Sequence, residues 1–129
     1  MTEQLTTIGT VRVELPPVAA MSRVARLTAT GVASMAGFTI DEIDDINVIV
    51  SEVMVALVEH GAHDNIAVTF DVTDGCFMVR GATELEDFDL DDPDLALCRT
   101  VLAAVSTQHG IEQDGLRAKI WATLQQSPA

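Results

Sequence analysis

Residues 39–61 constrain the fold most, because they predict one long helix that is apolar on nearly all sides. Thr39 and Glu42 have the spacing of a capping box at a helix start, and Gly61 is typical of the position just past a helix end. About six helical turns lie between these signals. A helix with so little polar surface is usually covered on several sides. Glu52 is the exception within its apolar centre, and a carboxylate there needs a partner or a function.

The composition predicts a single folded domain over residues 1–129. Hydrophobic residues make up 48% of the chain and charged residues 21%, which is typical of a globule with a real core. The formal net charge of −13 disfavours nucleic acid and anionic membranes as partners and favours a basic protein. Cys76 and Cys98 lack the spacing of metal ligands, so we expect two small buried side chains and no metal site.

The chain start lacks the basic and apolar regions of a signal peptide. It also contains no run of about 18 apolar residues, the length that a membrane span needs. We therefore expect a cytoplasmic protein that has no contact with a membrane.

The first half of the chain predicts a strand, two helices and a hairpin. Residues 7–15 alternate between apolar and polar side chains, as in a half-buried strand. Residues 17–36 have helical spacing of apolar side chains and lead into the long helix. Residues 65–82 predict a hairpin that turns at Asp74-Gly75 and pairs Val72 with Phe77.

The second half predicts an acidic loop, a third helix and a second hairpin. Six of the ten residues in 83–92 are acidic, which leaves two interpretations: a solvated mobile loop or a docking segment. Asp92-Pro93 predicts the start of a helix that runs to about residue 105. A hairpin that turns at Asp114-Gly115 would place Glu112 beside Arg117. Trp121 would then lie on the outer face.

The predicted order is therefore β-α-α-β-β-α-β-β. It favours an α+β two-layer sandwich, in which a mixed, mostly antiparallel sheet carries three helices on one face.

This order, with an acidic residue inside an apolar second helix, resembles the GHKL ATPase (Bergerat) fold and the bacterial anti-sigma-factor serine kinases in particular. The resemblance covers roughly residues 11–124 and is most specific from Ser51-Glu52 through His60. It implies a protein that binds ATP and Mg²⁺ beneath a glycine-rich lid. It also implies a homodimer that sequesters a sigma factor and phosphorylates a serine of an antagonist protein.

Three parts of the family's ATP site differ in this sequence. Glu52 matches the family's catalytic base, but the asparagine that holds Mg²⁺ four residues later is replaced by Ala56, whose methyl group cannot bind a metal. The adenine-binding Asp-x-Gly has no aspartate in the matching residues 79–82. The lid position, residues 83–92, has no glycine and six carboxylates. Two like charges at about 4 Å repel by roughly 4 kcal/mol at a dielectric of 20, so this lid opposes a triphosphate.

Glu52 keeps three interpretations: a retained catalytic base, a buried acid paired with Arg80 or a helix amide, or a solvated group at a pocket mouth. His60 and His63 are expected to be cap or surface residues, with a pH-sensitive pair or metal ligands as the alternative. By the resemblance, the candidate pocket positions are Ala56, Glu59, His60, Arg80 and Gly81.

Our first hypothesis is an anti-sigma-like regulator with a degenerate ATP site, which acts through protein contacts and needs no cofactor. Its expected partners are a sigma factor, an anti-anti-sigma antagonist protein, or both. One alternative is an active ATP-dependent serine kinase that uses ATP and Mg²⁺, with lid carboxylates as metal ligands. The other is an acidic structural or interaction protein.

Overall fold

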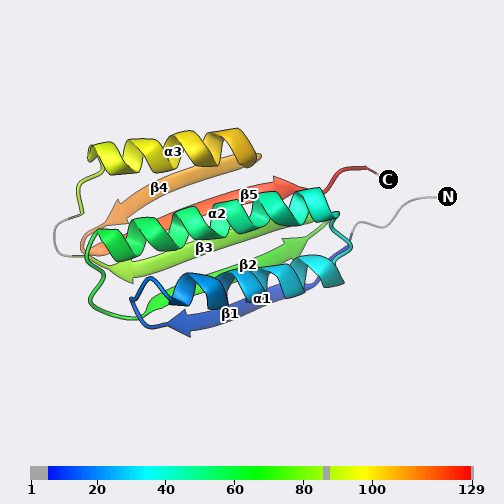
Figure 1. The fold of residues 1–129 in the computed structure, drawn as a ribbon, viewed down its shortest axis with the longest axis horizontal. Helices are drawn as coiled ribbons and strands as arrows, with labels where there is room; N and C mark the ends of the chain where they lie inside the picture. Colours follow the sequence, from blue (N-terminus) through cyan, green and yellow to red (C-terminus); the bar gives the residue numbers. More distant parts are fainter. Residues whose placement is uncertain (1–5, 86–87, 129) are drawn as a thin grey trace.

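The predicted elements follow one another in the predicted order and form a five-stranded sheet with three helices on one face (Figure 1). The computed structural model describes residues 6–85 and 88–128. The sheet order is β1-β2-β3-β5-β4, so the α+β two-layer prediction is confirmed. The elements are β1 (Gly9–Leu15), α1 (Met21–Met35), α2 (Ile40–Glu59), β2 (Ile66–Thr73), β3 (Cys76–Glu84), α3 (Pro93–Val105), β4 (Gln108–Asp114) and β5 (Arg117–Gln125).

Every strand pairing is antiparallel, where the sequence analysis expected a mixed sheet. The first hairpin has the predicted register, with Val72 opposite Phe77. Asp74 and Gly75 both have positive φ, 49° and 73°, which is the backbone of a type I′ turn. The twist of this turn matches the twist of the flanking strands, so its two residues define the register of the central sheet.

The second hairpin turns one residue later than predicted. Asp114 pairs with Arg117, so the turn residues are Gly115 and Leu116, and Glu112 lies opposite Lys119 instead of Arg117. Gly115 has φ +60°, as the first position of a type II′ turn requires. The pairing therefore moves by two residues, and this shift leaves every side chain on its predicted face.

Helix α2 begins as predicted. Its N-cap Thr39 accepts a hydrogen bond from the Glu42 amide at 3.2 Å, and the Thr39 amide donates to Glu42 Oε1 at 2.8 Å. The second carboxylate oxygen of Glu42 accepts from the Ser127 amide at 2.7 Å, so it also holds the segment that follows β5. The predicted first helix is shorter, because residues 17–20 form turns and α1 starts at Met21 without a side-chain cap.

The acidic segment differs from a simple solvated loop. Its first two residues, 83 and 84, belong to β3, and Leu85 and Phe88 are only 1% and 6% exposed. Residues 86–87 of the prediction lie outside the described residues. Asp92 caps α3, and Pro93 is its first helical residue, as predicted.

The helical layer packs closely on the sheet at Gly81. A Cβ atom placed on Gly81 would lie 2.6 Å from Val53 Cγ1 and 2.8 Å from Leu57 Cδ1, so α2 rests on the backbone of β3 at this point. The inward stripe of α2 is fully or nearly fully buried and consists of Ile46, Ile49, Val50, Val53, Met54 and Leu57. The core therefore lies between this stripe and one face of the sheet.

Trp121 lies on the other face of the sheet, as predicted. Its indole covers Gly110 in the neighbouring strand, where an added Cβ would lie 2.6 Å from Nε1. The ring thus fills the space above a residue that has no side chain, and a structural role accounts for its position.

Replacing Gly81 by alanine should destabilise the protein by about 1–3 kcal/mol, because the new methyl group must displace two buried side chains of α2. Gly31→Ala is the matched control: it lies within α1 with nothing within 4 Å, and it should stabilise the protein by up to about 1 kcal/mol. Urea unfolding of both variants measures the difference. Equal stability of the two variants would contradict the close approach of α2 and β3.

Glu42→Gln should reduce stability at pH 7 by about 0.5–1 kcal/mol. Burial favours a raised pKa, but the hydrogen bonds from Thr39 and Ser127 outweigh it, and the pKa of Glu42 is lowered from its ordinary 4.5. A lowered folded-state pKa contributes stability above pH 4.5 that is lost as the pH falls through the folded value. The difference in melting temperature between the wild type and the variant should therefore become smaller at acidic pH. The exposed control Glu112→Gln should show no such gap at any pH.

Candidate functional site

A cleft between α2 and α3 contains most of the pocket positions that the sequence suggested. Its cavity volume is about 190 Å³, below the roughly 300–1,000 Å³ that is usual for small-ligand sites. Helix α2 and its C-cap contribute Glu52, Val55, Ala56, Glu59 and His60. Helix α3 contributes Asp94, Leu97 and Cys98.

These side chains meet because both helices present stripes of the same spacing. Positions 52, 55, 56 and 59 lie on one face of α2, and positions 94, 97 and 98 lie on one face of α3. The result is a cleft with an apolar floor and three carboxylates, from Glu52, Glu59 and Asp94.

Glu52 lies in this cleft without a side-chain partner among the described residues. Partial burial raises its pKa above the ordinary 4.5, and the nearby charge of Glu59 raises it further. Burial likewise raises the pKa of Cys98 to about 11; the charge of Glu52 adds to this effect, and the charge of Arg99 partly offsets it. The two shifts agree that the cleft disfavours additional negative charge.

The expected pairing of Glu52 with Arg80 does not form. Arg80 lies opposite Trp121 on the open face of the sheet, whereas the helices cover the other face. Neighbouring side chains of a strand point to opposite faces, so Gly81 faces the helices and Arg80 faces away. Gly81 itself lies beneath Val53 and Leu57 and does not line the cleft.

His60 closes one end of the cleft. Its Nδ1 lies 2.7 Å from the Ala56 carbonyl oxygen, and its Nε2 lies 3.7 Å from Asp92 Oδ2. The ring also packs edge-on against Phe88, with centroids 5.8 Å apart. These contacts join Phe88 and Asp92, which precede α3, to the C-terminal end of α2.

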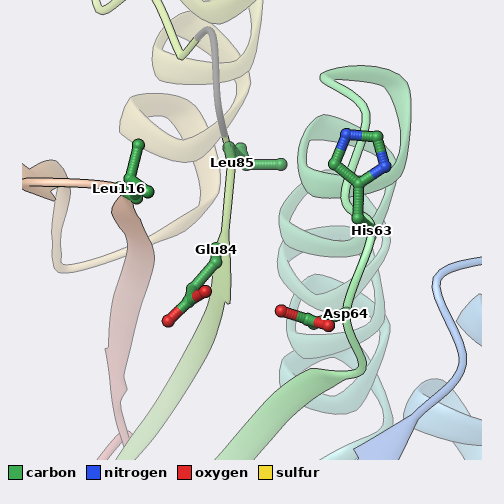
Figure 2. A pocket seen from close by; sticks show the side chains of 5 residues that line it. All are labelled: His63, Asp64, Glu84, Leu85 and Leu116. Carbon is green, nitrogen blue, oxygen red and sulfur yellow. The ribbon is translucent and has the colours of Figure 1, made fainter.

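His63 lies in a different, smaller cavity and does not pair with His60. This cavity has about 320 Å³ of empty space and lies where the α2–β2 connection meets the end of β3 and the β4–β5 turn (Figure 2). Figure 2 shows His63 and Asp64 on the connection, with Leu85 and Glu84 on the neighbouring segment. In residues 6–85 and 88–128, no three His, Cys, Asp or Glu side chains are grouped to hold a metal.

Comparison with known proteins places this architecture. The chain is 31% identical over 90 residues to the serine-protein kinase RsbW of Bacillus velezensis, a match that covers 67% of this chain and 56% of that protein. It is 36% identical over 72 residues to RsbW of Bacillus subtilis, which covers 53% of this chain and 45% of that protein. The resemblance to the GHKL anti-sigma serine kinases is confirmed.

The fold agrees with this relationship. A crystal structure of the RsbU and RsbW domains of a Mycobacterium tuberculosis protein superposes with a TM-score of 0.72 at 19% identity, over 91% of this chain and 32% of that one. No protein-family model matches the chain. The chain spans about half the length of the RsbW proteins that it matches. Across the described parts of the chain, no helix has both the length and the hydropathy of a membrane span.

The cleft of this RsbW-like chain does not fit Mg²⁺ and ATP. Ala56, which the resemblance matches to the family's metal ligand, lies in the cleft wall, where its methyl group offers no oxygen. The lining contains no Lys or Arg that could pair with phosphate oxygens. The charge of the three carboxylates opposes an anionic ligand at the same place.

Sequence reasoning missed the contribution of α3. Asp94, Leu97 and Cys98 line the cleft, although only the α2 side and the strand residues were expected there. Their i, i+3, i+4 spacing in the predicted third helix was the available signal. It could not show which neighbouring helix the stripe faces.

Glu52→Gln should stabilise the protein slightly at pH 7. A raised folded-state pKa means that the stability contributed by Glu52 is greatest below pH 4.5 and decreases as the pH rises through the folded value. The variant's gain in melting temperature should therefore vanish at acidic pH.

Glu59→Gln should lower the pKa of Glu52, which carboxyl NMR titration measures directly. An unchanged Glu52 titration in that variant would contradict the charge coupling.

Proposed function

We propose that this chain is an anti-sigma-type regulator that keeps the kinase fold, has a degenerate nucleotide site and acts through protein contacts. The observation that carries the proposal is the lining of the α2–α3 cleft, with Ala56 at the metal position and three carboxylates around it. The partners would be a sigma factor, its antagonist protein, or both, met in the cytoplasm. By analogy with the kinases, the regulator would act as a homodimer.

Electrostatics support the loss of nucleotide binding. A triphosphate entering the cleft would meet Glu52, Glu59 and Asp94, and the described lining of the cleft supplies no Lys or Arg to compensate them. Like charges at about 4 Å repel by roughly 4 kcal/mol at a dielectric of 20, so each carboxylate near a phosphate group would oppose binding. The overall charge of −13 adds to the same opposition.

The start of α3 supports the proposal independently. Free backbone amides at a helix N-terminus commonly bind phosphate. Here the Asp94 amide donates to the Asp92 carboxylate at 2.8 Å, so one of these amides already has an internal anionic partner. Leu85 and Phe88, which precede α3, are buried in the core. A nucleotide that displaced them would expose both side chains.

An active serine kinase remains the second candidate, because Glu52 lines the cleft and has a raised pKa. A general base works best when its pKa lies near the working pH. This candidate requires a metal held by groups other than position 56. It predicts transfer of phosphate to a serine of a partner protein, and Glu52→Gln should abolish that transfer.

Calorimetric titration with Mg²⁺ and ATP tests the proposal. The wild-type chain should show no binding tighter than about 100 µM, equivalent to roughly −5.5 kcal/mol. Ala56→Asn should also fail to bind, because it restores one metal ligand and leaves the three carboxylates in place. RsbW of Bacillus subtilis, titrated in parallel, is the reference protein. A dissociation constant of the wild-type chain for Mg²⁺ and ATP below about 100 µM would overturn the proposal in favour of the kinase. Phosphate transfer that depends on Glu52 would do the same.

A further inference from the structure

The α2–α3 cleft is an apolar groove with an exposed rim. Val55 is 41% exposed on the α2 side and Leu97 is 65% exposed on the α3 side, and both line the cleft. Ala56 and Cys98 form buried parts of its wall, at 6% and 3% exposure. Large apolar side chains that line a concave surface in contact with water are typical of interaction sites.

The charges around this groove select the partner. Glu52, Glu59 and Asp94 supply its formal charges, and His60 already contacts a carbonyl oxygen and the Asp92 carboxylate. The groove thus combines apolar contacts with a negative field. A metal ion does not match it, since the described residues hold no group of three metal-ligating side chains. A free small cation would leave Val55 and Leu97 in water.

We propose that this cleft binds a basic amphipathic helical segment of a protein partner. This inference rests on the proposed function. An apolar side chain of that segment packs between Val55 and Leu97, and a Lys or Arg nearby on the same face pairs with Glu52 and Glu59. This is the helix-in-groove mode of recognition, in which anchors at i, i+3 or i+4 enter a groove between two helices. The position vacated by the metal ligand, Ala56, leaves room for the anchor.

The pairing would give Glu52 the side-chain partner that it lacks among the described residues of the free protein. Entry of a cation would relieve its repulsion from Glu59, so part of the binding free energy comes from a strain already present in the free state. The affinity should fall as ionic strength rises, because at least part of the attraction acts through solvent. Electrostatic matching of this kind contributes mainly to specificity and association rate.

The test is a selection from a displayed library of random 12-residue peptides on the full chain, followed by fluorescence titration of the enriched peptides. Enriched sequences should combine Lys or Arg with an apolar residue at helical spacing. Glu52→Gln/Glu59→Gln should weaken their binding by about tenfold or more. The control Glu112→Gln/Asp114→Asn removes the same charge from β4, outside the cleft lining, and should change binding less than about twofold.

Each other outcome has a definite meaning. Enrichment of peptides without basic residues would overturn the inference, because the carboxylates of the cleft would then not select the partner. Equal loss of binding in both double variants would also overturn it, because the general acidity of the protein would then suffice. If spermidine binds with the same affinity as the peptides and with the same dependence on Glu52 and Glu59, one part of the inference fails. That part is the packing of an apolar side chain between Val55 and Leu97. If Mg²⁺ and ATP bind and displace the peptides, the proposed function itself fails. If neither nucleotide nor basic peptide binds, only the inference fails.

Discussion

The contact between α2 and the backbone of β3 at Gly81 governs the rest of the structure. Because no side chain separates them, Val53 and Leu57 lie directly on the sheet, and α2 occupies the centre of the helical layer. Its two flanks are then available to the other helices. On one flank, α1 is joined by polar contacts such as Thr30 Oγ1 to the Asn47 side chain at 3.2 Å. On the other flank, the cleft lies between α2 and α3.

Two faces of helix α2 therefore have different roles: one packs on the sheet and the other borders the cleft. The inward face carries the apolar residues that bury against the sheet, and its substitution would create cavities or clashes. The face at positions 52, 55, 56 and 59 borders the cleft and contributes less to the core. Ala56 is the exception on this face, because it is 6% exposed and belongs to the core cluster. Side chains at the exposed positions 55 and 59 can change with little effect on core packing.

Sequence patterns predicted those features that depend on local chemistry. The capping box, the first turn and the faces of the strands follow from neighbouring residues. Of the two cysteines that were expected to be buried, Cys98 is buried and Cys76 is only partly buried. The second turn was misplaced because Asp114-Gly115 and Gly115-Leu116 are both acceptable turns. The resulting two-residue shift leaves the alternation of Ile111, Ala118 and Ile120 unchanged, so hydrophobic pattern could not distinguish them.

The site was harder to predict because it depends on how distant elements meet. Motif position suggested Arg80 beside Glu52, although strand alternation alone places Arg80 and Gly81 on opposite faces. The α3 side of the cleft required knowing that α3 lies beside α2 and not over β1. That neighbour relationship is set by the crossing from β3 to β4, which no local signal in residues 83–92 specifies.

The negative field of the cleft also reflects how charge is divided between the two faces of the sheet. Four of the seven basic residues, Arg12, Arg80, Arg117 and Lys119, belong to strands and alternate onto the open face. Of the others, Arg26 donates to Ser51 and Arg99 to the Leu90 carbonyl, so both are engaged within the helical layer. The sheet thus lies between most of the positive charge and the cleft. A single substitution in the cleft would leave this distribution of charge in place.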